Sequence, residues 1–182
     1  TYEKLIPSAV LKKYKMQKQL QKVNPSVAHA CLYIGFKGSP QALRLPKNNL
    51  WIYPEKGDHD SIVAKYLKDP QAPFPVVYIS FPAAKDPSWS DRYPDRSTID
   101  IITLLPFDLV KQWEGTHWMK RGKDYEQLKT EISDRLLETL YQQLPHLKGK
   151  VDHHELSTPL STQNFVNYKE GEIYGIDHTP ER

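Results

Sequence analysis

Short apolar runs bounded by turn residues mark five segments of the chain as predicted β-strands. In the longest, 26–37 (SVAHACLYIGFK), both alternating sets of residues are largely apolar. A strand with two apolar faces is typical of the interior of a sheet that is covered on both sides. Gly35 within this strand indicates a bulge, or a close approach by a ligand or another backbone. The other predicted strands are shorter and cover 50–53, 76–81, 97–105 and 151–156.

Apolar residues three and four positions apart predict four helices. The most regular pattern covers 124–144, where Asp124 and Gln127 have the spacing of a capping box. In the same helix Glu131 and Arg135 have the spacing of an i,i+4 ion pair. The other helices are predicted at 8–23, at 58–67, and from a cap at Ser157 or Thr158 to about Asn167.

The order of these elements predicts an α+β fold. Strands follow one another in pairs, whereas a doubly wound parallel sheet requires strict alternation of strands and helices. We therefore expect a mainly antiparallel β-sheet with helices packed on it. With 182 residues, of which 38% are hydrophobic and 26% charged, the chain is long enough for one globular domain, residues 1–182.

Positive charge is concentrated at the start of the chain. Residues 1–22 contain six Lys and one Glu, whereas the rest of the chain has a small net negative charge. The sequence therefore does not predict the extended basic surface with which proteins bind nucleic acid. The helix predicted at 8–23 could carry its Lys residues on a solvated face. The alternative is that Lys12, Lys13 and Lys18 dock this helix on an anionic membrane surface.

The motifs of common catalytic and metal sites are absent from the sequence. It contains no Gly-x-Ser-x-Gly, no Cys-x-x-Cys and no Gly-x-Gly-x-x-Gly. His153, His154 and Glu155 do not predict a metal site, because successive residues of a strand point to opposite faces. Asp100 lies in an apolar strand, and we expect it either on a solvated face or buried with a partner.

The number of cysteines and the length of the apolar runs indicate where in the cell the protein is expected. The single Cys31 excludes an internal disulfide, which fits a reducing environment inside the cell. No apolar run reaches the ~20 residues that span a bilayer. We expect an intracellular protein that is soluble or peripherally associated with a membrane.

Three segments of the chain resemble the flavin-dependent phytoene-desaturase-like family. They are 81–113 (FPAAKDPSWSDRYPDRSTIDIITLLPFDLVKQW), 118–129 (WMKRGKDYEQLK) and 151–182 (VDHHELSTPLSTQNFVNYKEGEIYGIDHTPER), and the resemblance runs from about Pro25 to Arg182. The last segment is the most specific, with Thr158-Pro159 opening a helix and Gly171 and Gly175 closing the block. The chain is similar to the branch that holds retinol saturases and carotenoid isomerases.

The resemblance implies a fold like the substrate domain of FAD-dependent amine-oxidase and phytoene-desaturase-like enzymes. In that family a Gly-x-Gly-x-x-Gly segment and a Gly-rich C-terminal segment hold FAD, and this sequence contains neither. We therefore expect a fragment, the substrate-binding domain of a larger FAD-dependent oxidoreductase that reduces, desaturates or isomerises a conjugated polyene, a carotenoid or a retinoid. FAD is expected in the parent protein, and the isolated chain is expected to bind no FAD tightly and to be inactive.

No catalytic residue can be carried over from the resemblance, and the residue spacing itself predicts no metal site. Aromatic residues make up 11% of the chain, and core packing explains most of them, but an aromatic sheet face could also line a pocket for a long apolar ligand. For such a pocket we expect Tyr33, Gly35, Phe36, Tyr174 and Gly175 to bind substrate. Two alternatives remain: a free-standing module that binds apolar ligands, and an interaction domain similar to the related fold of proteins that escort prenylated partners.

Overall fold

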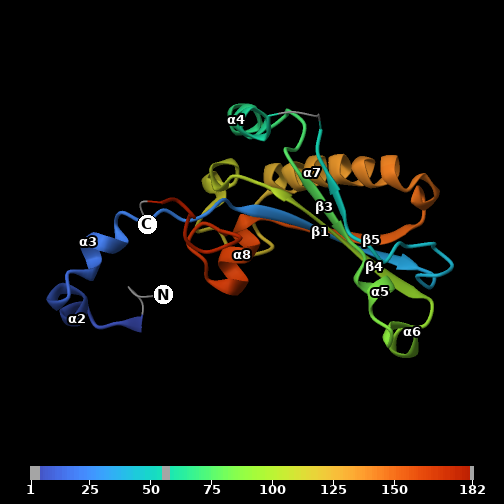
Figure 1. Cartoon of the computed structure of the whole chain (residues 1–182), viewed down its shortest axis with the longest axis horizontal. Helices are drawn as coiled ribbons and strands as arrows, with labels where there is room; N and C mark the ends of the chain where they lie inside the picture. Colours follow the sequence, from blue (N-terminus) through green and yellow to red (C-terminus); the bar gives the residue numbers. More distant parts are fainter. Residues whose placement is uncertain (1–4, 55–57, 181–182) are drawn as a thin grey trace.

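A computed structural model describes residues 5–54 and 58–180 of the chain. Its described strands form one five-stranded antiparallel sheet in the order β2-β3-β4-β1-β5 (Figure 1). The strands are β1 His29–Lys37, β2 Leu50–Ile52, β3 Val77–Ser80, β4 Arg96–Leu104 and β5 Val151–Ser157. The two longest strands, β1 and β4, pair along their whole length. The structure thus confirms the predicted α+β class.

Helices lie on one face of the sheet and at its ends. The longest, α7 Lys123–Gln143, runs along the sheet (Figure 1). The other helices are α2 Ser8–Lys13, α3 Met16–Leu20, α4 His59–Lys68, α5 Pro82–Lys85, α6 Trp89–Arg92 and α8 Pro159–Val166, with 3-10 turns η1 Phe107–Leu109, η2 Lys111–Trp113 and η3 Pro145–Leu147.

The hydrophobic core lies between the sheet and α7. The even-numbered residues of β1 from Ala30 to Phe36 point into this core, and each is at most 2% exposed. Leu136 and Leu140 of α7 pack in the same cluster and are fully buried. The i, i+4 spacing of these two leucines puts both on the helix face that meets the sheet.

The opposite face of β1 is partly open in the part of the chain that the structure describes. Tyr33 points to this face and is 52% exposed, whereas Cys31 on the same face is 3% exposed. The expectation that β1 is covered on both faces is therefore wrong at Tyr33. The reason lies in the neighbouring strands, because Tyr33 is flanked by Asp100 on β4 and by Glu155 on β5. A polar row of this kind is decided by strand pairing and cannot be seen in the pattern of one strand.

Helix α7 begins differently from the sequence prediction. Its N-cap is Gly122, with a φ of 96° and no side-chain cap, so the capping box predicted at Asp124 is wrong. Asp124 lies in the first turn, where its charge is favourable to the helix dipole. Arg135 donates to the carbonyl oxygens of Pro70 and Ala72, whereas Glu131 accepts from Gln127, so the predicted Glu131–Arg135 pair is replaced by other partners.

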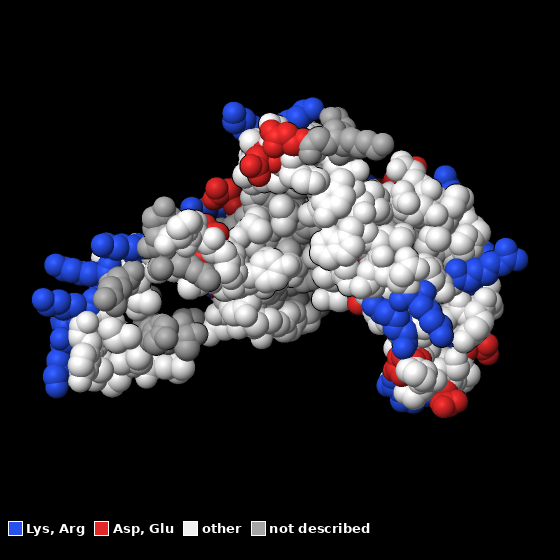
Figure 2. Space-filling view, in the orientation of Figure 1, with Lys and Arg blue, Asp and Glu red and all other residues white. Residues whose placement is uncertain are grey.

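The N-terminal helix predicted at 8–23 is two short helices. Helix α2 ends at Lys13 and α3 begins at Met16, because Lys15 takes a left-handed φ of 53° between them. Both helices lie to one side of the sheet (Figure 1), and Figure 2 shows basic side chains along their outer side. Across residues 5–54 and 58–180, no helix combines the length and the apolar character that crossing a bilayer requires.

The C-terminal segment pairs with the residues that lead into β1. The carbonyl of Val27 accepts from the N–H of Ile173 (3.0 Å), and the carbonyl of Gly175 accepts from the N–H of Ser26 (2.8 Å). Isolated bridges join Pro25 with Ile176 and Ala28 with Glu172. The segment therefore extends the sheet at the N-terminal end of β1, next to α8.

Candidate functional site

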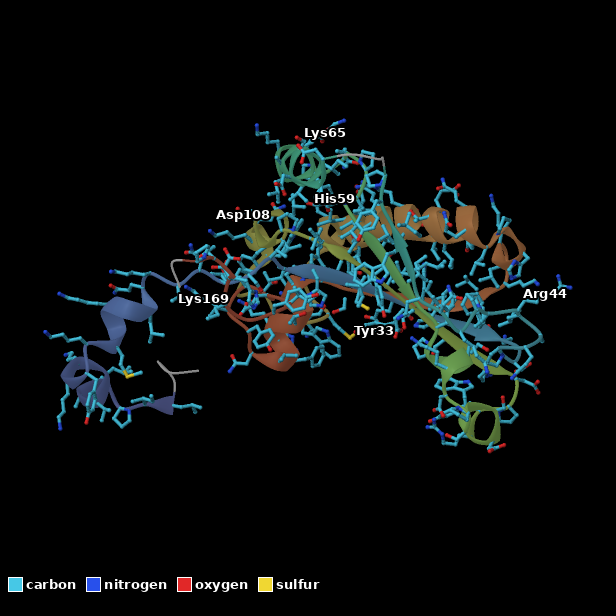
Figure 3. All side chains as sticks on the ribbon, in the orientation of Figure 1. Tyr33, Arg44, His59, Lys65, Asp108 and Lys169 are labelled. Carbon is cyan, nitrogen blue, oxygen red and sulfur yellow. The ribbon has the colours of Figure 1, made fainter. Side chains whose placement is uncertain are left out.

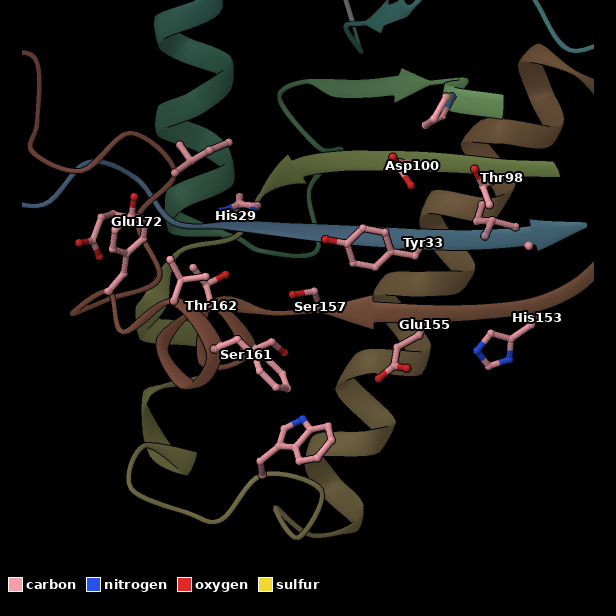
Figure 4. A pocket seen from close by; sticks show the side chains of 18 residues that line it. His29, Tyr33, Thr98, Asp100, His153, Glu155, Ser157, Ser161, Thr162 and Glu172 are labelled. Atoms are coloured by element: carbon pink, nitrogen blue, oxygen red, sulfur yellow. The ribbon is translucent and has the colours of Figure 1, made fainter. Parts of the chain in front are cut away.

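A pocket of about 900 Å³ lies on the open face of the sheet (Figure 4). Its floor is formed by β1, β4 and β5, and its walls by α8, by the loop before α7 and by the C-terminal segment. The floor includes Tyr33, Gly35, Thr98, Asp100, His153, Glu155 and Ser157, and the walls include Trp118, Phe165, Val166, Tyr168 and Ile173. This volume lies in the usual range of small-molecule sites, ~300–1,000 Å³.

Antiparallel pairing arranges the floor in rows across three strands. Tyr33 lies in the middle of one row, with Asp100 directly across on β4 and Glu155 directly across on β5. In the next row Gly35 lies between Thr98 and His153. Tyr33 lies at the centre of this face (Figure 3 and Figure 4). Its phenol is the largest side-chain group of the floor.

Burial shifts the titration of the floor residues. Burial, with smaller contributions from the neighbouring Cys31 and Asp100, raises the pKa of Tyr33 to about 12. The same desolvation raises the pKa of the Cys31 thiol to about 11. It also raises the pKa of Asp100, against the opposing charge of Lys85. The Tyr33 phenol and the Cys31 thiol are therefore neutral at physiological pH, and neither is an activated nucleophile.

An apolar wall faces this polar floor. Trp118 and Phe165 meet edge to face, with ring centroids 5.2 Å apart, and both are partly exposed, as is Val166. The wall brings together a loop and a helix that are nearly fifty residues apart in the sequence. An apolar wall over a polar floor suits a ligand that is largely apolar and carries one polar group.

His29 lines the pocket toward the C-terminal segment. Its Nδ1 is buried and has no hydrogen-bond partner among the described residues. Burial lowers the pKa of His29, so the ring is neutral at physiological pH. A buried polar atom without a partner costs free energy in the folded protein.

The structure separates the residues that the sequence predicts as substrate-binding. Tyr33 and Gly35 line the pocket. The pairing of β1 with β5 shifts register between Gly35 and Phe36, in agreement with the bulge that was one of the alternatives for Gly35. Phe36 points to the other face of the sheet and lies in the core, 1% exposed. Tyr174 and Gly175 lie outside the lining, and their backbone holds Ser26.

Several lining residues were missed or misread in the sequence. Glu155 stands out there only as a failed metal ligand, whereas strand pairing puts it beside Tyr33. Trp118 and Phe165 carry no periodic signal that would place them on the same pocket. Asp100 is half-buried on the pocket side, between the two alternatives that the sequence left open.

Replacing Asp100 by Asn is expected to stabilise the folded protein at neutral pH by less than about 1 kcal/mol, since a half-exposed charge is screened by solvent. Burial raises the folded-state pKa above the unfolded value, so between those values the folded protein binds more protons than the unfolded chain. The free energy of unfolding of the native protein therefore decreases as pH rises from the unfolded-state pKa to the folded-state pKa of Asp100. The Asn variant should not show this decrease. Urea unfolding of both proteins over a series of pH values measures it, and a variant that is less stable at neutral pH contradicts the prediction.

Several known proteins are similar to this chain in sequence. No family model matches it. It is 34% identical to the all-trans-retinol 13,14-reductase of Rattus norvegicus over 182 residues, and 30% identical to that of Homo sapiens, in each case across 98% of this chain and 30% of the relative. It is 28% identical to a Danio rerio protein named inactive all-trans-retinol 13,14-reductase, across 88% of this chain. The chain thus spans about 30% of the length of the relatives it matches. The match extends over almost all residues of this chain, which supports its resemblance to the retinol saturase branch of the phytoene-desaturase-like family.

Proposed function

We propose that residues 1–182 form the substrate-binding domain of an FAD-dependent oxidoreductase that acts on a conjugated polyene, in the first place a retinoid. The observation that carries this proposal is the pocket on the open sheet face, with its apolar wall of Trp118 and Phe165. Tyr33 and Gly35 are the substrate-binding residues of the floor. The names of the relatives support a retinoid as the ligand.

The pocket does not fit the diphosphate of FAD, the cofactor that the family resemblance implies. Diphosphates are bound by backbone N–H groups of Gly-rich loops at helix N-termini, or by Arg and Lys. The carboxylates of Asp100, Glu155 and Glu172 line this pocket, and its described lining includes no Lys or Arg. In this proposal the diphosphate is held by parts of the parent protein beyond these residues, and this domain binds and orients the polyene.

A second candidate function is a module that binds apolar ligands without redox activity. It is favoured by the fact that the described residues form the pocket on their own. One relative is, moreover, named inactive. Both functions require the same ligand pocket, and they differ in whether the parent protein reduces or oxidises the bound ligand.

Binding of all-trans-retinol to the chain tests the pocket. Trp118 lies in the pocket wall, so energy transfer from tryptophan to bound retinol reports occupancy. A graded series at Gly35 supplies the control. An added Cβ meets only the carbonyl oxygen of His153 at 3.8 Å, an ordinary contact, so Gly35→Ala should bind retinol almost as the native chain does. Gly35→Leu fills the floor and should weaken binding about tenfold or more, since it removes room for several ligand atoms.

Retinol binding that is unaffected by Gly35→Leu would place the ligand elsewhere and refute this pocket. If the pocket holds retinol, the flavin absorbance of the parent protein decides between the two functions. A change in that absorbance on adding retinol supports the oxidoreductase, and an unchanged spectrum supports the binding module.

We also propose that Lys12, Lys13 and Lys18 dock the domain on anionic lipid. Lys12, Lys13 and Lys18 are exposed on α2 and α3, which lie to one side of the sheet (Figure 1). Basic residues near a membrane contribute about 1 kcal/mol each to binding at an anionic surface. Changing these three Lys to Gln should therefore weaken co-sedimentation with anionic vesicles about a hundredfold.

The matched control changes three exposed Lys on the rest of the surface, Lys47, Lys68 and Lys148, to Gln. This control has the same net charge and should bind nearly as the native chain does. Equal losses in the two triple variants, or equal pelleting with anionic and neutral vesicles, would show that the N-terminal helices do not dock.

A further inference from the structure

We infer that the pocket selects its ligands by charge, with Asp100 and Glu155 admitting apolar amines and alcohols and rejecting apolar carboxylates. The inference rests on the proposed function, because it concerns the same pocket. It assigns to Asp100 and Glu155 a role in ligand specificity that strand pairing alone makes visible.

The Asp, Glu, Lys and Arg side chains that line the pocket are all acidic. Asp100, Glu155 and Glu172 bring three carboxylates to the pocket, and its described lining includes no Lys or Arg. His29 lines it as a neutral ring, and His153 is the other imidazole. The potential inside the pocket is therefore negative, which favours a cation and opposes an anion.

The two Lys residues that interact with the floor carboxylates lie outside the pocket lining. Lys85 lies near Asp100, but its Nζ donates to Oδ1 of Asn49 (2.7 Å) and to Oγ of Ser80 (2.8 Å). Lys129 reaches Glu155 from α7 with an Nζ–Oε1 distance of 3.7 Å, and it also lies 4.0 Å from Glu126. Neither Lys is part of the lining, so neither offers its ammonium group to a ligand carboxylate there.

Asp100 should have the larger effect of the two floor carboxylates. It is half-buried, and the desolvation that raises its pKa also weakens the screening of its charge. The side chain of Glu155 is 63% exposed, so water screens it more. Both flank the Tyr33 phenol, which is neutral and can bond to a ligand hydroxyl or ammonium.

Three probes with the same twelve-carbon tail separate charge from apolar binding: dodecylamine, 1-dodecanol and dodecanoate. Isothermal titration calorimetry of the 182-residue chain at neutral pH and low salt should rank them amine, alcohol, carboxylate. The dissociation constants of successive probes in this ranking should differ by about tenfold or more, as expected for unit charges a few ångströms apart in a partly solvated site. High salt should make both differences smaller.

The double variant D100N/E155Q keeps the shape of the floor and removes its two charges. We expect its preference for the amine over the carboxylate to shrink about tenfold or more. The matched control D134N/E138Q makes the same changes on the exposed surface of α7, away from the pocket, and should keep the native ranking. Thermal unfolding of both variants verifies that each is folded.

The outcomes distinguish the inference from the function on which it rests. If all three probes bind the native chain equally, or if both double variants change the ranking alike, charge selection is overturned and the apolar pocket stands. If none of the probes binds, both the inference and the proposed pocket are overturned.

Discussion

Gly171→Ala is expected to lower the free energy of unfolding by about 3 kcal/mol or more, the largest effect that we predict for a single substitution. An added Cβ would lie 2.5 Å from both Cα and the carbonyl oxygen of Pro159. These are backbone atoms at the start of α8, so neither can move away without displacing the helix. Gly171 also has a φ of 67°, which costs a residue with a Cβ roughly 1–2 kcal/mol.

Gly175→Ala is the matched control for this prediction. Gly175 has a similar φ of 76°, but an added Cβ would meet no atom within 4 Å. Its cost should be the backbone term alone, about 1 kcal/mol. Urea unfolding of the two variants measures both values, and equal losses would show that contact with Pro159 contributes nothing.

Loss of Gly171 should also weaken the pocket. The residues after Gly171 pair with 26–28, and Glu172 and Ile173 line the wall. If the clash with Pro159 pushes this segment away from α8, retinol binding should fall in Gly171→Ala and stay nearly unchanged in Gly175→Ala. Fluorescence titration at a temperature where both variants are folded separates this effect from unfolding.

Arg135→Met is expected to destabilise the protein by about 3 kcal/mol, the second largest effect. The guanidinium of Arg135 donates to the carbonyl oxygens of Pro70 (2.9 Å) and Ala72 (2.6 Å). It also stacks 4.1 Å from the ring centroid of Phe74. Met retains an apolar stem of similar length but leaves two carbonyls unpaired in a partly buried setting, at ~1–3 kcal/mol for each.

Arg135→Lys tests whether the planar fork or the positive charge matters. A single ammonium cannot reproduce two bonds in the geometry of a guanidinium, so we expect a loss of about half that of the Met variant. Thermal and urea unfolding of both variants measure whether stability decreases from the native protein to the Lys variant and then to the Met variant. A Lys variant as stable as the native chain would show that charge alone suffices.

The connector 69–75 depends on this residue. It contains three prolines, and Arg135 attaches it to α7, next to the buried ring of Tyr66. The phenol of Tyr66 in turn donates to the carbonyl oxygen of Leu104 (3.0 Å). Arg135 therefore holds the connector against α7, and Tyr66 holds α4 against the end of β4. The spacing of Arg135 from Glu131 did not suggest this role.

Most of the fold could be predicted from local sequence patterns. The five strands and the helices α4, α7 and α8 lie within a few residues of their predicted ranges, because alternation and 3.6-residue spacing are local properties. The adjacent pairs of strands predicted antiparallel pairing, and the structure confirms it. The N-terminal helix was predicted too long, because the left-handed turn at Lys15 has no Gly to announce it.

The candidate site could be predicted only in part. Tyr33 and Gly35 lie on one strand and were assigned to the pocket from that strand alone. Phe36 was assigned with them, but neighbours along a strand point to opposite faces, and the structure places its side chain in the core. Tyr174 is predicted to bind substrate as part of the last segment of the family resemblance, whereas the residue is 68% exposed and lies outside the pocket lining.

The sequence by itself determined the elements of this protein, its antiparallel class and its family resemblance, because each depends on residues close together in the chain. Only the tertiary structure decided which face of β1 is open and which carboxylates flank Tyr33. It also decided that Trp118 and Phe165 form one wall. The physical reason is that Asp100, Tyr33 and Glu155 are neighbours through hydrogen-bonded strand pairing, and register across a sheet is fixed by contacts that no single strand contains.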